Sequence, residues 1–125
     1  MIKPDLKSLS LAIQSAYERK NPDEVLAFYH PDIIMIGPSM ANQVNGIEEF
    51  RDLLEIQFAN PQRSTVKLSD FSIGEIRDGV FTVLCRIEGR QSIYYSTYPF
   101  KGWLSRVFVT SDDTYRIIFE HLTLS

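Results

Sequence analysis

Three ionisable side chains are predicted to lie on apolar strand faces, where they could bind a ligand. Alternate residues of a strand share a face, which places Arg86, Arg106 and His121 each among mainly apolar neighbours. By the same alternation His121 shares the face of Ile117. An unpaired charge on such a face costs several kcal/mol, so each group needs a partner, water or a ligand. Two arginines and a histidine would suit an anionic or carbonyl-bearing small molecule, for example a carboxylate.

A structural role explains the same residues without a ligand. Arg86 could form a salt bridge with Glu88, Asp70 or a carboxylate on a helix. His121 could be hydrogen-bonded inside the sheet or lie at a dimer interface. Both alternatives stay open from the sequence.

Four aromatic side chains could supply the apolar walls of a binding pocket. They are Tyr17, Tyr29, Trp103 and Phe108. The alternative is that each belongs to the ordinary core of the protein.

Asp70 and His121 are the best placed candidates for acid–base catalysis. The chain has no glycine-rich phosphate loop, no nucleophile elbow and no cluster with metal-ligand spacing, so we expect no metal and no cofactor. Its single cysteine, Cys85, lies in an apolar run and is expected to be a buried, inert thiol.

The elements that must position these residues follow from hydrophobic periodicity. Helical spacing predicts three helices, over residues 6–17, 22–29 and 47–58, with a short strand over 33–36. Asn21 should cap the second helix, Pro22 should begin it, and Glu24 should complete the capping box. A period of two then predicts strands over 66–76, 80–88, 92–100, 103–109 and 115–123, with turns at Asp78-Gly79 and Gly89-Arg90 and an interruption at Lys101-Gly102. This order predicts an α+β fold with a mainly antiparallel sheet.

Length and charge limit the classes of partner. The 125 residues, 44% of them hydrophobic, predict a single domain over 1–125. Thirteen basic and sixteen acidic residues give a net charge of −3 without a basic run, which disfavours a nucleic-acid partner. No apolar stretch approaches the roughly 20 residues that cross a bilayer, and no signal-peptide pattern begins the chain. We therefore expect a cytoplasmic protein with no membrane partner.

Several phrases, in this order, resemble the SnoaL-like group of the nuclear transport factor 2-like superfamily. They are the segments 27–33 (AFYHPDI), 46–50 (GIEEF) and 115–123 (YRIIFEHLT). Within that superfamily, Leu84-Cys85-Arg86 and Ser105-Arg106-Val107-Phe108 are similar to phrases of the association domain of calcium/calmodulin-dependent protein kinase II. The resemblance covers nearly the whole chain.

The resemblance implies a fold and leaves the function open. The family fold is a cone in which three N-terminal helices pack in the concavity of a strongly curved sheet, with a pocket at the wide end. The kinase resemblance implies that Arg86 and Arg106 lie in that pocket. Family members include isomerases, polyketide cyclases, dehydratases and non-catalytic association domains, so function must be argued from the site.

Three hypotheses follow. The first is a homodimeric domain that binds a small organic molecule through Arg86, Arg106 and His121. The second is an isomerase, cyclase or dehydratase in which His121 or Asp70 is the general acid or base. The third is a self-association module that uses the outer sheet face and the tyrosines between Tyr94 and Tyr98.

Overall fold

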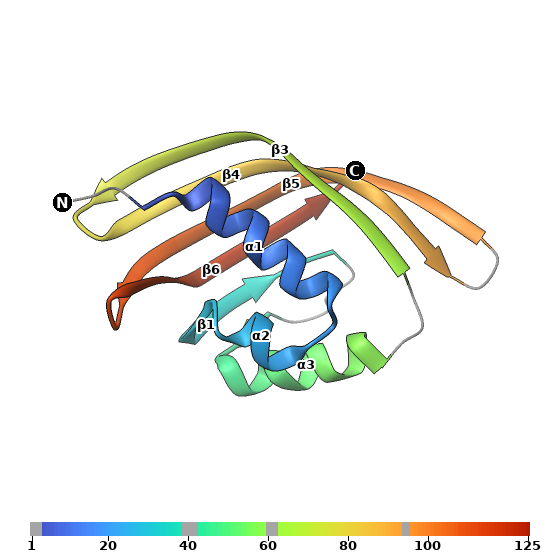
Figure 1. Cartoon of the computed structure of the whole chain (residues 1–125), viewed down its shortest axis with the longest axis horizontal. Helices are drawn as coiled ribbons and strands as arrows, with labels where there is room; N and C mark the ends of the chain where they lie inside the picture. The colour runs from blue at the N-terminus through green and yellow to red at the C-terminus, as the bar shows by residue number, and fades with distance from the viewer. Residues whose placement is uncertain (1–3, 39–42, 60–62, 94–95) are drawn as a thin grey trace.

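The computed structural model describes residues 4–38, 43–59, 63–93 and 96–125. Within these ranges the chain forms three helices and a six-stranded sheet, which confirms the α+β prediction (Figure 1). The elements in chain order are α1 (Leu6–Glu18), α2 (Pro22–Leu26), β1 (Tyr29–Ile36), β2 (Val44–Asn45), α3 (Ile47–Ala59), β3 (Arg63–Arg77), β4 (Val80–Ile93), β5 (Ser96–Ser111) and β6 (Thr114–Leu124). No helix among the described residues is long and apolar enough to cross a membrane.

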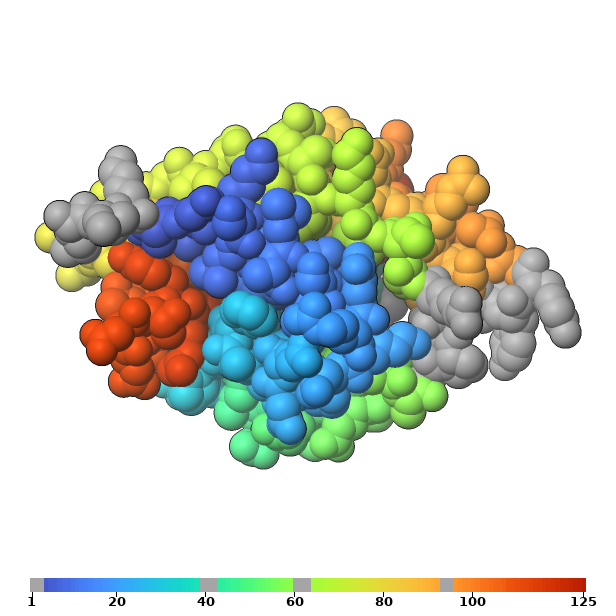
Figure 2. Space-filling model, viewed as in Figure 1, coloured from blue at the N-terminus to red at the C-terminus, as the bar shows by residue number. Residues whose placement is uncertain are grey.

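The sheet has the strand order β2-β1-β6-β5-β4-β3. Its pairs are antiparallel except β1 with β6, which run parallel. The sheet is open, with β2 and β3 at its edges, and strong curvature into a cone stays a prediction. All three helices lie on one side of the sheet, called here the inner face, and cover the middle of the molecule in the space-filling view (Figures 1 and 2). The opposite side is called the outer face.

Two predicted interruptions of the sheet are wrong. Strand β4 continues through Gly89-Arg90 to Ile93, and β5 continues through Lys101-Gly102, so one long hairpin replaces three shorter strands. A Cβ atom added at Gly89 or Gly102 would collide with the backbone carbonyl of a neighbouring strand, Thr65 or Thr123 respectively. These glycines therefore permit close approach of strands and do not mark turns. Tyr94 and Tyr95, named above for self-association, lie outside the described residues.

The core lies between the inner face and the helices. Strands β4 and β5 point alternate side chains inward, and these pack against apolar residues of α1, α2 and α3. Its largest fully buried members include Phe50 from α3 and Phe108 from β5. Cys85 is also buried, as predicted, and burial raises the pKa of its thiol.

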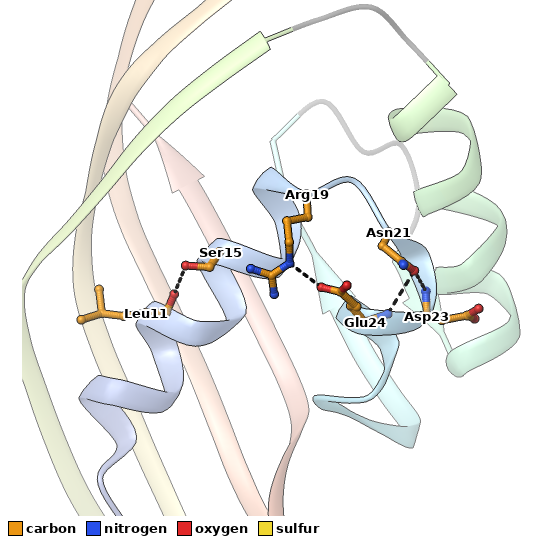
Figure 3. A network of polar contacts seen from close by, with 6 residues as sticks. All are labelled: Leu11, Ser15, Arg19, Asn21, Asp23 and Glu24. Atoms are coloured by element: carbon orange, nitrogen blue, oxygen red, sulfur yellow. Dashed lines mark hydrogen bonds and ion pairs between the residues drawn. The ribbon is translucent and has the colours of Figure 1, made fainter.

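The connection between α1 and α2 is a tight, polar turn (Figure 3). The side-chain oxygen of Asn21 accepts hydrogen bonds from the backbone N–H groups of Asp23 (3.0 Å) and Glu24 (3.4 Å), so the predicted N-cap is confirmed. The Glu24 carboxylate does not complete a capping box; it accepts a hydrogen bond from Arg19 Nε at 2.6 Å. Lys20, with φ 54°, completes the reversal of the chain. The turn thus fixes the end of α1 relative to the start of α2.

Replacing Asn21 by alanine should loosen this turn. The change removes the acceptor for two backbone donors, and we expect the free energy of unfolding to fall by about 1 kcal/mol. Equilibrium denaturation in urea measures the loss, with Gln57→Ala on the exposed side of α3 as the control. Equal stability of the two variants would show that the cap contributes nothing.

Candidate functional site

A buried salt bridge lies at the middle of the inner face. Arg106 on β5 and Glu120 on β6 are directly opposite each other in the sheet, and Arg106 Nε donates to Glu120 Oε1 at 2.7 Å. The side chains are 6% and 12% exposed. The neighbours of Arg106 along β5 on the same face are the buried Leu104 and Phe108. The ion pair is therefore surrounded by apolar side chains on the inner face.

A β-bulge in β6 turns Glu120 inward. Phe108 pairs with Ile117, whereas Val107 pairs with Phe119, so Ile118 is an extra residue that shifts the alternation. The prediction that His121 shares the face of Ile117 is wrong for this reason. His121 lies opposite Ser105 on the outer face, where it is exposed.

Two tyrosines extend the ion pair toward the helices. Tyr29, the first residue of β1, donates its hydroxyl hydrogen to Glu120 Oε1 at 2.7 Å. The hydroxyl oxygens of Tyr29 and Tyr17, which lies at the end of α1, are 2.8 Å apart. Together Arg106, Glu120, Tyr29 and Tyr17 form what we call the polar cluster.

The elements described above hold the tyrosines in place. Tyr17 follows Ile13 by one helical turn, so both face the sheet. Its ring meets Phe58 of α3 edge to face, with centroids 6.3 Å apart. The Tyr29 ring meets Phe50 of α3 in the same way at 4.6 Å. Tyr29 is buried, whereas Tyr17 and Glu120 are each partly exposed.

Burial and charge set the protonation of the cluster. Burial raises the pKa of Tyr17 and of Tyr29 well above the ordinary value, and the nearby Glu120 charge raises both further. Burial alone would lower the pKa of Arg106, but Glu120 and the two tyrosines outweigh it, and that pKa is raised. At neutral pH the cluster thus has a charged guanidinium and two neutral phenols.

The remaining predicted residues do not join this cluster. Arg86 lies on the outer face, with its guanidinium carbon 5.2 Å from the centre of the Trp103 ring and its Nε 4.0 Å from Asp70 Oδ2. Asp70 is 70% exposed. The two arginines that the family resemblance implied for one pocket are therefore on opposite faces. Phe108 is on the inner face and belongs to the core.

Glu120 is the residue that the sequence reasoning missed. Simple alternation hides it, because the bulge at Ile118 reverses the facing of every later residue in β6. One signal was present: Arg106 on an apolar face needed a carboxylate, and Glu120 lies on the neighbouring strand. Among the described residues, no group of three or more His, Cys, Asp or Glu is placed to hold a metal ion.

A groove of about 730 Å³ lies elsewhere, at the far end of β3, β4 and β5. Its charged residues are Lys67, Glu88, Arg90 and Lys101, and Phe100 is among its apolar residues. At roughly 3.4 Å per residue, it begins about 17 Å along β5 from Arg106. This groove and the polar cluster are separate places on the molecule.

The outer face carries a group of exposed apolar side chains. Ile34 and Phe119 are paired neighbours on β1 and β6, and Val107 on β5, the partner of Phe119, connects them toward the apolar residues of β5 and β4. We call this set the apolar outer patch; it consists of Ile34, Ile36, Leu84, Trp103 and Phe119, each 38–43% exposed. His121 lies within this patch, and Arg86 lies beside it.

Comparison with known families gives one match over nearly the whole chain. The sequence model of the SnoaL-like domain matches residues 6–124. Among curated proteins, none matches the chain.

Solved structures share the fold at low sequence identity. A protein from Xanthomonas campestris, assigned as a calcium/calmodulin-dependent protein kinase II association domain, superposes with a TM-score of 0.83 at 13% identity, covering 97% of this chain and 86% of the other. A protein assigned as a dehydratase of the NTF2-like family, from Streptomyces avermitilis, also gives 0.83 at 13% identity, covering 96% and 93%. A ketosteroid isomerase-like protein from Erwinia carotovora atroseptica gives 0.79 at 14% identity, covering 94% and 92%. At such identities the likeness establishes the fold alone.

A double-mutant cycle tests the energetics of the ion pair. Glu120→Met or Arg106→Met alone leaves one buried charge without its partner, and each should lower the free energy of unfolding by about 3–5 kcal/mol. The double variant replaces both charges with apolar groups and should recover most of that loss. Denaturation in guanidinium chloride measures all four proteins. A double variant as unstable as the sum of the single variants would contradict the coupling.

Proposed function

This chain belongs to the SnoaL-like domain family, and from that premise we propose that it is a homodimeric domain that binds a small organic molecule at the polar cluster. The observation that carries the proposal is the buried Arg106–Glu120 pair bonded to Tyr29.

Stability alone does not explain such a pair. Well-packed apolar residues in place of a buried ion pair are often neutral or stabilising, because both charges lose their hydration. Groups with strongly perturbed pKa values are common at functional sites. Three of the four members, Arg106, Tyr17 and Tyr29, are also residues that the sequence assigned to ligand binding.

The ligand would approach from the side of Tyr17. Tyr17 is a partly exposed member of the cluster on the side of the helices, and Phe58 on α3 is its aromatic neighbour. A small molecule lying against these two rings would meet one polar group and an apolar wall, the usual composition of a binding site.

Catalysis by His121 or Asp70 is not advanced as the function. Both side chains are exposed on the sheet away from the polar cluster, His121 opposite Ser105 and Asp70 beside Arg86. A general base must come within hydrogen-bonding distance of the group whose proton it removes.

Fragment binding followed by two-dimensional ¹⁵N–¹H NMR tests the proposed site. We expect small aromatic fragments to shift the amide signals around Tyr17 and Phe58. Tyr17→Ala, which removes the ring and its hydroxyl, should weaken binding at least fivefold. Lys101→Ala, in the separate groove, is the matched control and should leave the affinity unchanged. Shifts confined to Thr65, Val66 and Phe100 would move the site to the groove and overturn the proposal.

The apolar outer patch supports the homodimer. Monomeric proteins rarely expose large contiguous apolar patches, and in the described part of the chain every helix covers the other face. In a two-fold dimer the same patch occurs on both subunits, so Trp103 and Phe119 would meet apolar partners.

Light scattering coupled to size-exclusion chromatography tests the dimer. At micromolar concentration we expect twice the 14.4 kDa mass of the chain. Phe119→Asp should give a folded monomer, because a charge would be buried in the interface. Ile56→Asp is the control: Ile56 is 72% exposed on α3, and its replacement should leave the dimer intact. A monomeric wild-type protein would refute the dimer.

A further inference from the structure

The hydrogen bonds of the polar cluster have only one consistent direction. A phenol carries a single hydroxyl hydrogen. Tyr29 donates its hydrogen to Glu120 Oε1, which also accepts from Arg106 Nε. The 2.8 Å contact between Tyr29 and Tyr17 therefore needs the hydrogen of Tyr17. Every hydrogen in the chain thus points toward Glu120.

This order leaves Tyr17 as an acceptor toward any ligand. Its hydrogen is committed to Tyr29, so the free capacity of its oxygen is a lone pair. Both phenols stay protonated at neutral pH, because burial and the Glu120 charge raise their pKa values. A ligand at Tyr17 can be recognised through an O–H or N–H group, whereas a carbonyl oxygen there would face another lone pair.

The charge balance of the cluster disfavours an anion. Glu120 neutralises Arg106 at 2.7 Å, and both side chains are largely buried. A bound carboxylate would add a second negative charge close to Glu120 in a poorly solvated place, which is costly. A carboxylate ligand was expected because two arginines were predicted to bind it together. Arg86 lies on the outer face, so that expectation no longer holds.

We propose that the ligand is a neutral molecule whose hydroxyl or N–H group donates a hydrogen bond to Tyr17, so that neutral donors are selected over carbonyl compounds and carboxylates. This inference rests on the proposed function, because it specifies the ligand class of the same site.

Four matched probes separate the possibilities. Benzyl alcohol has a donor, benzyl methyl ether lacks it, benzaldehyde offers only a carbonyl acceptor, and benzoate is an anion. Titrations of the full chain, followed through the amide signals near Tyr17 and Phe58, give an affinity for each probe. We expect benzyl alcohol to bind about fivefold more tightly than the ether, and more tightly than the aldehyde and benzoate.

Two variants show whether the hydrogen-bond order causes the preference. Tyr17→Phe keeps the ring and removes the acceptor, so the difference between alcohol and ether should shrink to less than twofold. The double variant Arg106→Met/Glu120→Met removes the acceptor of Tyr29. Tyr29 can then donate to Tyr17, and Tyr17 can donate to a ligand, so benzaldehyde should gain affinity relative to benzyl alcohol.

The outcomes distinguish this inference from the proposed function. Binding near Tyr17 with benzaldehyde or benzoate equal to or tighter than benzyl alcohol would overturn the ligand class and leave the site standing. No binding of any probe near Tyr17 would overturn the proposed function itself. A preference for the alcohol that survives Tyr17→Phe unchanged would overturn the role of Tyr17.

Discussion

The ion pair between Arg106 and Glu120 is the interaction on which the account of this protein depends. Two charges on the apolar inner face must lie in register, because each would otherwise be buried without a partner. The extra residue Ile118 achieves this by shifting β6 by one position. Without the bulge Glu120 would face outward and Arg106 would be left unpaired. The β-bulge at Ile118 is thus required for the Arg106–Glu120 ion pair to form.

The two faces of the sheet differ in their chemistry. On the inner face the charges are balanced and the hydrogen bonds run from Tyr17 through Tyr29 to Glu120. On the outer face, exposed apolar side chains such as Trp103 and Phe119 lie among polar residues that include His121. The proposed ligand site lies on the inner face and the proposed dimer contact on the outer face, so one sheet would serve both roles. The short turn capped by Asn21 joins α1, which carries Tyr17, to α2, which precedes the strand that carries Tyr29.

Local patterns predicted most of the fold and named three of the four residues of the polar cluster. The helices begin near the predicted residues because their caps and apolar spacing are local signals, and the Asn21 cap is an example. The glycines at 89 and 102 misled the strand prediction, because their role depends on contacts with distant strands that the local sequence does not reveal. From their types and positions, Arg106 was predicted as a ligand-binding residue and Tyr17 and Tyr29 as apolar walls of a pocket, and these roles stay predictions. Glu120 was missed and His121 was placed on the wrong face for the same reason. A bulge depends on how two strands pair, and the alternation of residues along one strand does not reveal it.

Neutron diffraction from deuterium-exchanged crystals would test the central claim most directly, because it locates hydroxyl hydrogens. The account predicts a deuteron on the Tyr29 oxygen directed at Glu120 Oε1 and a deuteron on the Tyr17 oxygen directed at Tyr29. A Tyr29 deuteron directed at Tyr17, or a Tyr17 deuteron directed away from the cluster, would contradict the proposed order and with it the ligand class.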